Sequence, residues 1–279
     1  MILGLPAQIW YGAILGAILT VIVGFIHFLL KTFWRRIKES RPVRKLLGGV
    51  ANSSDECRIF VTDLFPQNAP EFIAIDRITP GSYRIGIVPN IPHVWPDVEA
   101  RAVSYLNYVL GRVGKTKNVS IVRRSEDSGN WNSNIIVIGA QCPRSFAFYQ
   151  RMQYVAYRMN GTGIYDAITN ERIERQDGYG YGIILKCRNP FKTDGNGVAF
   201  LVGGFGVLGT IAAAYYLKEH FSDLGRYFGR RFFGILVRAP IDVGEEAVER
   251  MQQYDIRFTA NGVPQTRGKN RWVRHVASA

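Results

Sequence analysis

Residues 1–30 contain no lysine, arginine, aspartate or glutamate. Within them, the run from Ile9 to Leu30 is apolar almost throughout, and about 20 such residues suffice to cross a hydrocarbon core. A secretory signal would need a basic start, a shorter apolar core and a small-residue cleavage site, and the sequence has none of these. A buried helix of a globular domain usually keeps a polar face. The missing charge therefore predicts a transmembrane helix over 8–30, after a short extracytoplasmic N-terminus over 1–7.

The charge missing from this stretch appears directly after it, as basic residues only briefly interrupted by Glu39. They are Lys31, Arg35, Arg36, Lys38, Arg41, Arg44 and Lys45. Positive residues stay on the cytoplasmic side, which predicts a single-pass protein of the inner (cytoplasmic) membrane with its N-terminus outside and its bulk in the cytoplasm. Attraction of this segment to anionic headgroups accounts for part of the net charge of +13. We therefore expect a membrane partner and no nucleic acid.

Cysteine is scarce, and histidine and acidic residues form no cluster. The 3 cysteines, Cys57, Cys142 and Cys187, lie at wide and irregular spacing, which fits neither a zinc site nor a disulfide framework. No carboxylate pair or catalytic triad stands out. We expect no metal, and the sequence leaves any cofactor unknown.

Small residues recur every four positions in the predicted span, at Gly12, Gly16, Thr20 and Gly24. Such a face lets two helix backbones approach closely, which predicts a homo-oligomer built along it. The alternative is that the glycines carry no contact, because glycine is common in membrane helices.

The rest of the chain alternates strand and helix signals, which is typical of parallel βα units. The predicted fold class is α/β, with the single N-terminal transmembrane helix followed by a mainly parallel, Rossmann-like sheet flanked by helices. A basic juxtamembrane segment and linker (31–56) leads to a cytosolic domain (57–258) and a basic C-terminal tail (259–279). Predicted strands are 58–62, 83–89, 119–122, 134–139, 182–187, 198–202 and 232–238, and predicted helices are 96–110, 143–159 and 209–228; a hairpin or a lid is expected within 162–177.

Three predicted strands end in turns that lead into helices, at 87–97, 136–145 and 200–210. Ligands of open α/β sheets collect beyond the carboxyl ends of the strands. These three turns are therefore expected to converge on one crevice.

The turn "LVGGFGVLGT" carries the glycine spacing of a dinucleotide fingerprint, with Gly203, Gly204, Gly206, Gly209 and Thr210 as candidate phosphate ligands. Glycines let the backbone approach a phosphate, and the N–H groups at a helix start favour an anion. No lysine follows the last glycine, so the turn is not a P-loop. The next strand ends at Arg238 where a Rossmann fingerprint expects an acidic residue. The alternative is that the glycines only allow close packing of helix on sheet.

Two other turns offer further candidates. Gly139, Arg144 and Ser145 are expected to hold a second anionic group, and Trp95 to stack on a base. Cys142 before Pro143 and His93 are the candidate reactive groups of an enzyme. A small residue at a tight turn and a solvated loop histidine are the alternatives for these two.

The segment "YGYGIILKCRNPF", followed by "VAFLVGGFGVLGTIAAAYYL", resembles a recurrent α/β module of uncharacterised bacterial proteins. Asn189-Pro190-Phe191 and Gly206–Ala214 match its motifs. The glycine-rich helix start is also more weakly similar to that of the Rossmann-like SLOG nucleotide-binding superfamily, which uses Gly-Gly-x-Gly-Thr. Alanines stand at 212–214, where its hydrolases carry a glutamate, which argues against phosphoribohydrolase activity.

The sequence thus predicts a membrane-anchored sensor or effector whose cytosolic domain binds a nucleotide-like or other phosphorylated ligand and signals through oligomerisation. A nucleotide- or NAD-processing enzyme is the first alternative. A structural interaction protein without a small ligand is the second.

Overall fold

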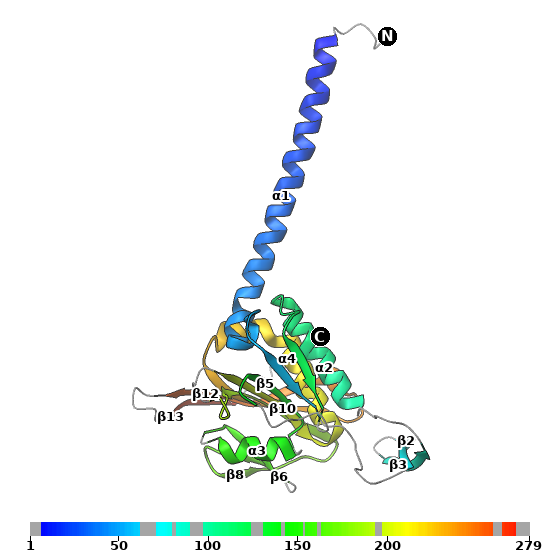
Figure 1. The fold of residues 1–279 in the computed structure, drawn as a ribbon, viewed down its shortest axis with the longest axis vertical. Coiled ribbons are helices and arrows are strands. Elements are labelled where there is room, and N and C mark those ends of the chain that lie inside the picture. Colours follow the sequence, from blue (N-terminus) through cyan, green and yellow to red (C-terminus); the bar gives the residue numbers. More distant parts are fainter. Residues whose placement is uncertain are drawn as a thin grey trace.

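The structure is a computed structural model of the 279-residue chain. It describes residues 7–61, 71–79, 82–89, 97–123, 131–140, 143–152, 154–160, 163–192, 197–258 and 264–271. The helices are α1 (Ala7–Leu47), α2 (Asp97–Arg112), α3 (Pro143–Arg151) and α4 (Gly206–Tyr227), with short 3₁₀ turns η1 (Gly48–Ala51) and η3 (Glu245–Ala247). The chain is an α/β protein with a central sheet flanked by helices (Figure 1).

The central sheet has eight strands in the order β13-β12-β11-β9-β10-β5-β1-β4. These strands are β1 (Cys57–Phe60), β4 (Val119–Val122), β5 (Asn134–Ile138), β9 (Tyr179–Arg188), β10 (Val198–Phe205), β11 (Phe232–Pro240), β12 (Glu249–Phe258) and β13 (Pro264–Arg271). The pairings among β4, β1, β5 and β10 are parallel, whereas every pairing from β10 through β9 to β13 is antiparallel. The expectation of a mainly parallel sheet is therefore corrected to a mixed sheet with a parallel half.

Both faces of this sheet are covered, because buried apolar residues alternate along the strands. Ile136, Phe200 and Ile184 point to a core shared with α1, α2 and α4. Ile135, Leu201 and Ile183, their neighbours in sequence, point to a second core under α3 and a small sheet of β6 (Tyr157–Asn160), β7 (Gly163–Asp166) and β8 (Glu171–Ile173). The sheet is thus the middle of three layers.

Helix α1 belongs to the domain at one end and projects from it at the other (Figure 1). Val43, Leu46 and Leu47 are at most 2% exposed, and Val50 in η1 is fully buried in the same core. The predicted linker 46–56 therefore starts as part of the core, because its apolar residues continue the buried face of the helix.

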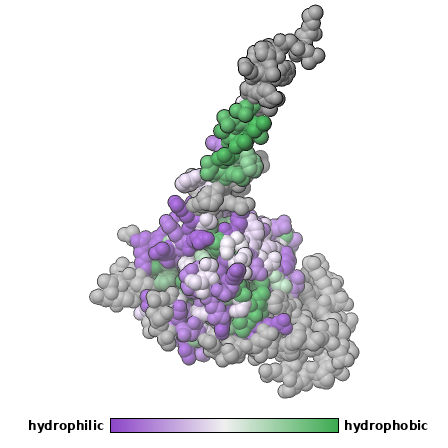
Figure 2. Space-filling model, turned by 45° about the horizontal axis from the view of Figure 1, so that its top comes forward, coloured by the Kyte–Doolittle hydropathy of each residue, from purple (hydrophilic) through white to green (hydrophobic). Residues whose placement is uncertain are grey.

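The projecting part of α1 carries exposed apolar side chains, such as Leu15, Phe25 and Leu30 at 71%, 60% and 51% exposure. They form the green segment in Figure 2. Over the described residues, whose side chains in α1 begin at Leu15, no helix reaches the length and apolar character that crossing a membrane requires. The transmembrane helix over 8–30 consequently stays a prediction.

Several other elements differ from the expected ones. Residues 83–89 do form a strand, β3 (Ser82–Pro89), but it pairs with β2 (Glu71–Thr79) in a separate two-stranded sheet. The predicted helix over 143–159 stops at Arg151, since Tyr157–Asn160 alternates buried and exposed residues and forms β6. A β7–β8 hairpin occupies part of 162–177, as one of the two expectations had it. Finally, the predicted tail begins with β13, which pairs with β12.

Candidate functional site

The carboxyl ends of β4, β1, β5 and β10 lie at one edge of the sheet, because these strands are parallel. Helices α3 and α4 both begin at this edge. Two of the three predicted turns meet there: the Gly139 N–H donates to the Val202 carbonyl at 3.0 Å. The third turn follows β3 in the separate hairpin, and its residues 90–96, with Trp95 and His93, lie outside the described residues.

The glycine turn is a tight contact between β10 and the first turn of α4. A Cβ on Gly204 would come within 2.1 Å of the Gly209 carbonyl carbon, and one on Gly203 within 2.3 Å of the Ala140 nitrogen. The Gly204 N–H donates to the Thr210 hydroxyl at 3.0 Å, and Thr210 is only 5% exposed. In this conformation the Gly204 N–H and the Thr210 hydroxyl are hydrogen-bonded to each other. The space left by the missing side chains is filled by the protein's own backbone and not by a ligand. The surroundings of Gly206 lie outside the described residues.

Two further glycines that the sequence reasoning missed complete this contact from β9. A Cβ on Gly182 would come within 2.2 Å of the Gly209 carbonyl oxygen, and one on Gly180 within 2.9 Å of the Leu208 Cβ. Gly180 and Gly182 are two residues apart in one strand, so they share a face of the sheet. The "YGYG" alternation was the signal that a helix start packs on this strand.

Arg144 and Ser145 are close to the place that the sequence predicted, but they bind protein backbone. The Arg144 Nη1 donates to the carbonyl of Val61, at the end of β1, at 2.6 Å and to that of Val122, the last residue of β4, at 3.1 Å. The Ser145 hydroxyl donates to the carbonyl of Gly139, whose φ of +87° favours glycine. With exposures of 7% and 0%, Arg144 and Ser145 tie the first turn of α3 to the strand ends.

The two described cysteines are buried structural residues. Burial raises the pKa of the Cys57 thiol to about 12, and it raises the pKa of the Cys187 thiol further. Neither thiol is available as a thiolate near neutral pH. Cys142, the candidate nucleophile, lies outside the described residues. Among the described residues no group of histidine, cysteine and acidic side chains could hold a metal ion.

A cavity of about 660 Å³ is lined by residues 172–179 and Ile241. Its lining includes Arg172, Arg175 and Tyr179, with Glu174 and Asp177 balancing the two arginines. The Arg175 guanidinium lies 3.7 Å from the centre of the Phe205 ring, and Phe205 is the residue before α4. The first turn of α4 has neither a side-chain cap nor an acidic residue. Sequence reasoning missed Arg175, because its position against Phe205 depends on the fold.

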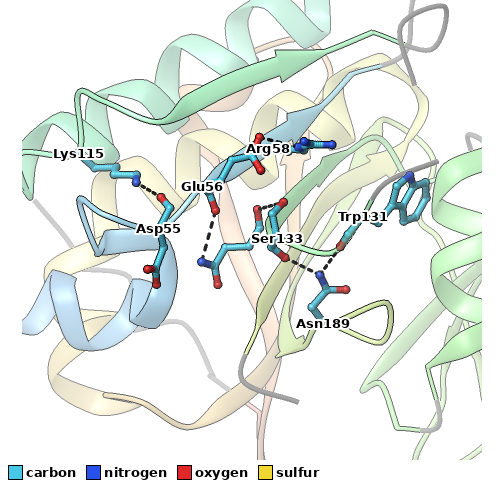
Figure 3. A network of polar contacts seen from close by, with 8 residues as sticks. Asp55, Glu56, Arg58, Lys115, Trp131, Ser133 and Asn189 are labelled. Atoms are coloured by element: carbon cyan, nitrogen blue, oxygen red, sulfur yellow. Dashed lines mark hydrogen bonds and ion pairs between the residues drawn. The ribbon is translucent and has the colours of Figure 1, made fainter. Parts of the chain in front are cut away.

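The "NPF" turn (Asn189-Pro190-Phe191) lies at the opposite, amino-terminal edge of the parallel strands. The buried Asn189 amide donates to the carbonyls of Trp131 at 2.8 Å and Ser133 at 2.6 Å (Figure 3). The Phe191 ring meets the Trp131 ring edge-on at 4.3 Å between centres. This network fixes the chain before β5 to the connection between β9 and β10.

A second part of the same edge is held by Lys115. Its ammonium donates to the carbonyl of Asn52 and to that of Asp55, just before β1; Figure 3 shows the contact with Asp55. Glu56 accepts from Arg58 at 2.8 Å through its carboxylate and from Asn134 at 3.4 Å through its carbonyl. All of these contacts order the strand starts.

No protein-family model, curated protein or solved structure matches this chain. The resemblance to the bacterial α/β module and to the SLOG superfamily therefore stays a prediction.

Proposed function

We propose that the protein is a membrane-anchored sensor or effector whose α/β domain binds a nucleotide-like or other phosphorylated ligand and communicates with its anchor helix. The proposal places residues 8–30 across the inner membrane, with the N-terminus outside and the domain in the cytoplasm. One observation carries it: α4 runs from the glycine turn to a buried contact with α1.

The anchor is supported by the exposed part of α1. Its described apolar side chains between Leu15 and Leu30 point to all sides of a helix that leaves the domain. Exposing so many large apolar side chains to water is unfavourable, at about 25 cal/mol for each Å². The uncharged sequence from Ile9 and the basic residues that follow the run agree with a lipid environment on one side and the cytoplasm on the other.

A ligand at the start of α4 is supported by its uncapped first turn and by the cavity that Arg175 lines. Backbone N–H groups at a helix start attract anions. Since Gly204 and Thr210 bind each other, the contacts to an anion fall to the N–H groups of the turn around Gly206 and to Arg175.

Communication with the anchor is supported by the course of α4. Its first turn lies at the ligand edge, and near its last turn Gly225 contacts Pro42 of α1. A ligand that binds one position of α4 more tightly than another would shift α4 toward that position and thereby displace α1.

Self-association is the proposed output. Gly16 and Gly24 have open space where a Cβ would stand, and the Thr20 hydroxyl is turned back onto the Gly16 carbonyl at 2.8 Å. The face along Gly12, Gly16, Thr20 and Gly24 thus offers bare backbone to a second helix.

The test has two parts. Full-length protein should stay with the membrane through carbonate extraction; release into the supernatant would contradict the anchor. A panel of nucleotides and other phosphorylated compounds should contain at least one that raises the melting temperature, and Arg175→Gln should abolish that shift. The control is Arg226→Gln at the other end of α4, which should keep it.

The enzyme alternative predicts that the protein converts at least one compound of the panel into a product. Replacing His93 or Cys142 should then abolish this turnover. The structural alternative predicts no shift with any compound. Arg144, Ser145 and the glycines of the turn make buried contacts with other parts of the protein. For these residues, a structural role is therefore favoured over ligand binding.

A further inference from the structure

Lys186 is a buried lysine in the middle of the central sheet. It lies in β9, is 1% exposed, and stands between Phe200 of β10 and Phe233 of β11, its cross-strand neighbours. Lysine is almost never fully buried without a charged partner. Such a position requires a reason.

Its ammonium reaches the place where α1 and α4 end together. Nζ lies 3.2 Å from the Gly229 carbonyl oxygen, just beyond α4, and 3.4 Å from the Lys45 carbonyl oxygen in the last turn of α1. The negative ends of two helix dipoles thus face one cation. Lys186 is the side chain that binds both helices from the sheet beneath them.

Among the described residues, no carboxylate forms a hydrogen bond or ion pair with the Lys186 ammonium. Asp255 of β12 lies in the same cross-strand row, two strands or about 10 Å away. Arg231 and Arg257 bind its Oδ2, and its Oδ1 is buried without a hydrogen-bond partner in the described part of the chain. The charged group that acts on Lys186 is another cation, Arg230 after α4.

We propose that Lys186 makes the α1–α4 junction acid-sensitive: gaining a proton on Lys186 loosens the attachment of α1 to α4. Among the described residues, the hydrogen-bond partners of the ammonium are carbonyl groups, so the charged form is poorly compensated in the closed junction. Local opening would let water reach it. The link from this opening to signalling rests on the proposed function, but the opening itself requires neither ligand nor membrane.

The direction of the effect follows from the protonation states. Burial, and secondarily the charge of Arg230, lowers the pKa of Lys186 to about 7. In the open junction the lysine would return toward its usual pKa of about 10.4. Between these values the closed form binds fewer protons than the open form, so raising the pH stabilises the closed junction and lowering it toward 7 and below favours opening.

The experiment measures hydrogen-exchange protection factors in the full chain in detergent, at residues 43–47 and 224–229. Opening should be about tenfold more frequent at pH 6 than at pH 8. Lys186→Met should abolish this dependence. Two controls should keep it: Lys45→Met, which removes an exposed lysine of α1, and His220→Gln, which removes an imidazole of α4 whose pKa is lowered by burial.

A dependence that persists in Lys186→Met, or that disappears in His220→Gln, would overturn the proposal. If Lys186→Met does not fold, an NMR titration of the Lys186 side chain in the natural protein decides instead. A midpoint near 7 supports the proposal, and a midpoint above about 9 contradicts it. Failure of the anchor or of ligand binding would leave these readouts unchanged, so the two proposals fail separately.

Discussion

Gly225 of α4 lies so close to Pro42 of α1 that a Cβ on Gly225 would come within 2.3 Å of the Pro42 carbonyl oxygen. The two helices cross at a point where one of them has no side chain. Around this crossing pack Val43 and Leu46 of α1 and Leu224 of α4, all of them buried.

Gly225→Ala should therefore lower the free energy of unfolding by about 1–3 kcal/mol, the usual cost of overpacking. Alanine normally stabilises a helix relative to glycine by about 1 kcal/mol. Gly111→Ala in α2, where no atom lies within 4 Å of the new Cβ, should show that gain. Urea denaturation measures the free energy of unfolding of both variants. An equal change in the two would mean that α1 and α4 move apart enough to accommodate the new Cβ at no cost.

The Thr210 hydroxyl is the acceptor for a buried backbone N–H. Thr210→Val should cost about 1–3 kcal/mol because it leaves the Gly204 N–H without a partner. Thr210→Ser keeps the oxygen and should stay within about 1 kcal/mol of the natural protein. Denaturation in the absence of any ligand tests this prediction. A Thr210→Val protein of unchanged stability that had lost a ligand would instead assign the hydroxyl to binding.

Asn189 should be one of the least replaceable polar residues of the domain. Asn189→Ala leaves the buried carbonyls of Trp131 and Ser133 without their donor and should cost about 2–3 kcal/mol. Asn189→Asp should be worse, because a carboxylate would then face two carbonyl oxygens. The exposed Asn107 of α2 provides the control, and Asn107→Ala should change stability by less than about 0.5 kcal/mol.

The small-residue face of α1 predicts a difference between two substitutions of similar bulk. Gly16→Ile should separate two associated helices and weaken crosslinking between copies in the membrane. Ala17→Ile adds side-chain volume about 100° around the helix and should leave crosslinking unchanged. Equal crosslinking of both variants would indicate that the face contacts lipid only.

Sequence reasoning located the parallel half of the sheet well, since its strands are short apolar runs followed by glycine turns or helix starts. It failed for the orientation of β9. Only residues 189–197 join β9 to β10, and a parallel connection needs a dozen or more residues. This short connection already indicated an antiparallel pair. A lysine in the buried run "GIILKC" gave no such warning, because its hydrogen-bond partners come from two helix ends that are distant in sequence.

The candidate ligand residues show the other limit. Glycine, threonine, arginine and serine at strand ends are suited both to anions and to backbone carbonyls or N–H groups. Spacing alone does not separate these partners. Whether such a residue binds an anion or the protein depends on which backbone lies next to it in the fold. At Gly209 the neighbour is β9, and at Arg144 it is the end of β1.

Helix α1 continues without a break from its exposed apolar part into the buried core, over 41 residues. At 1.5 Å per residue it is about 60 Å long, so a tilt of about 10° displaces one end by about 10 Å relative to the other. Because the shorter, buried part of the helix is fixed next to α4 and η1, tilting the projecting part would turn the domain with it. If α1 spans the membrane as proposed, a change in bilayer thickness, which alters the tilt of a spanning helix, would reorient the whole sheet without any change in the sheet itself.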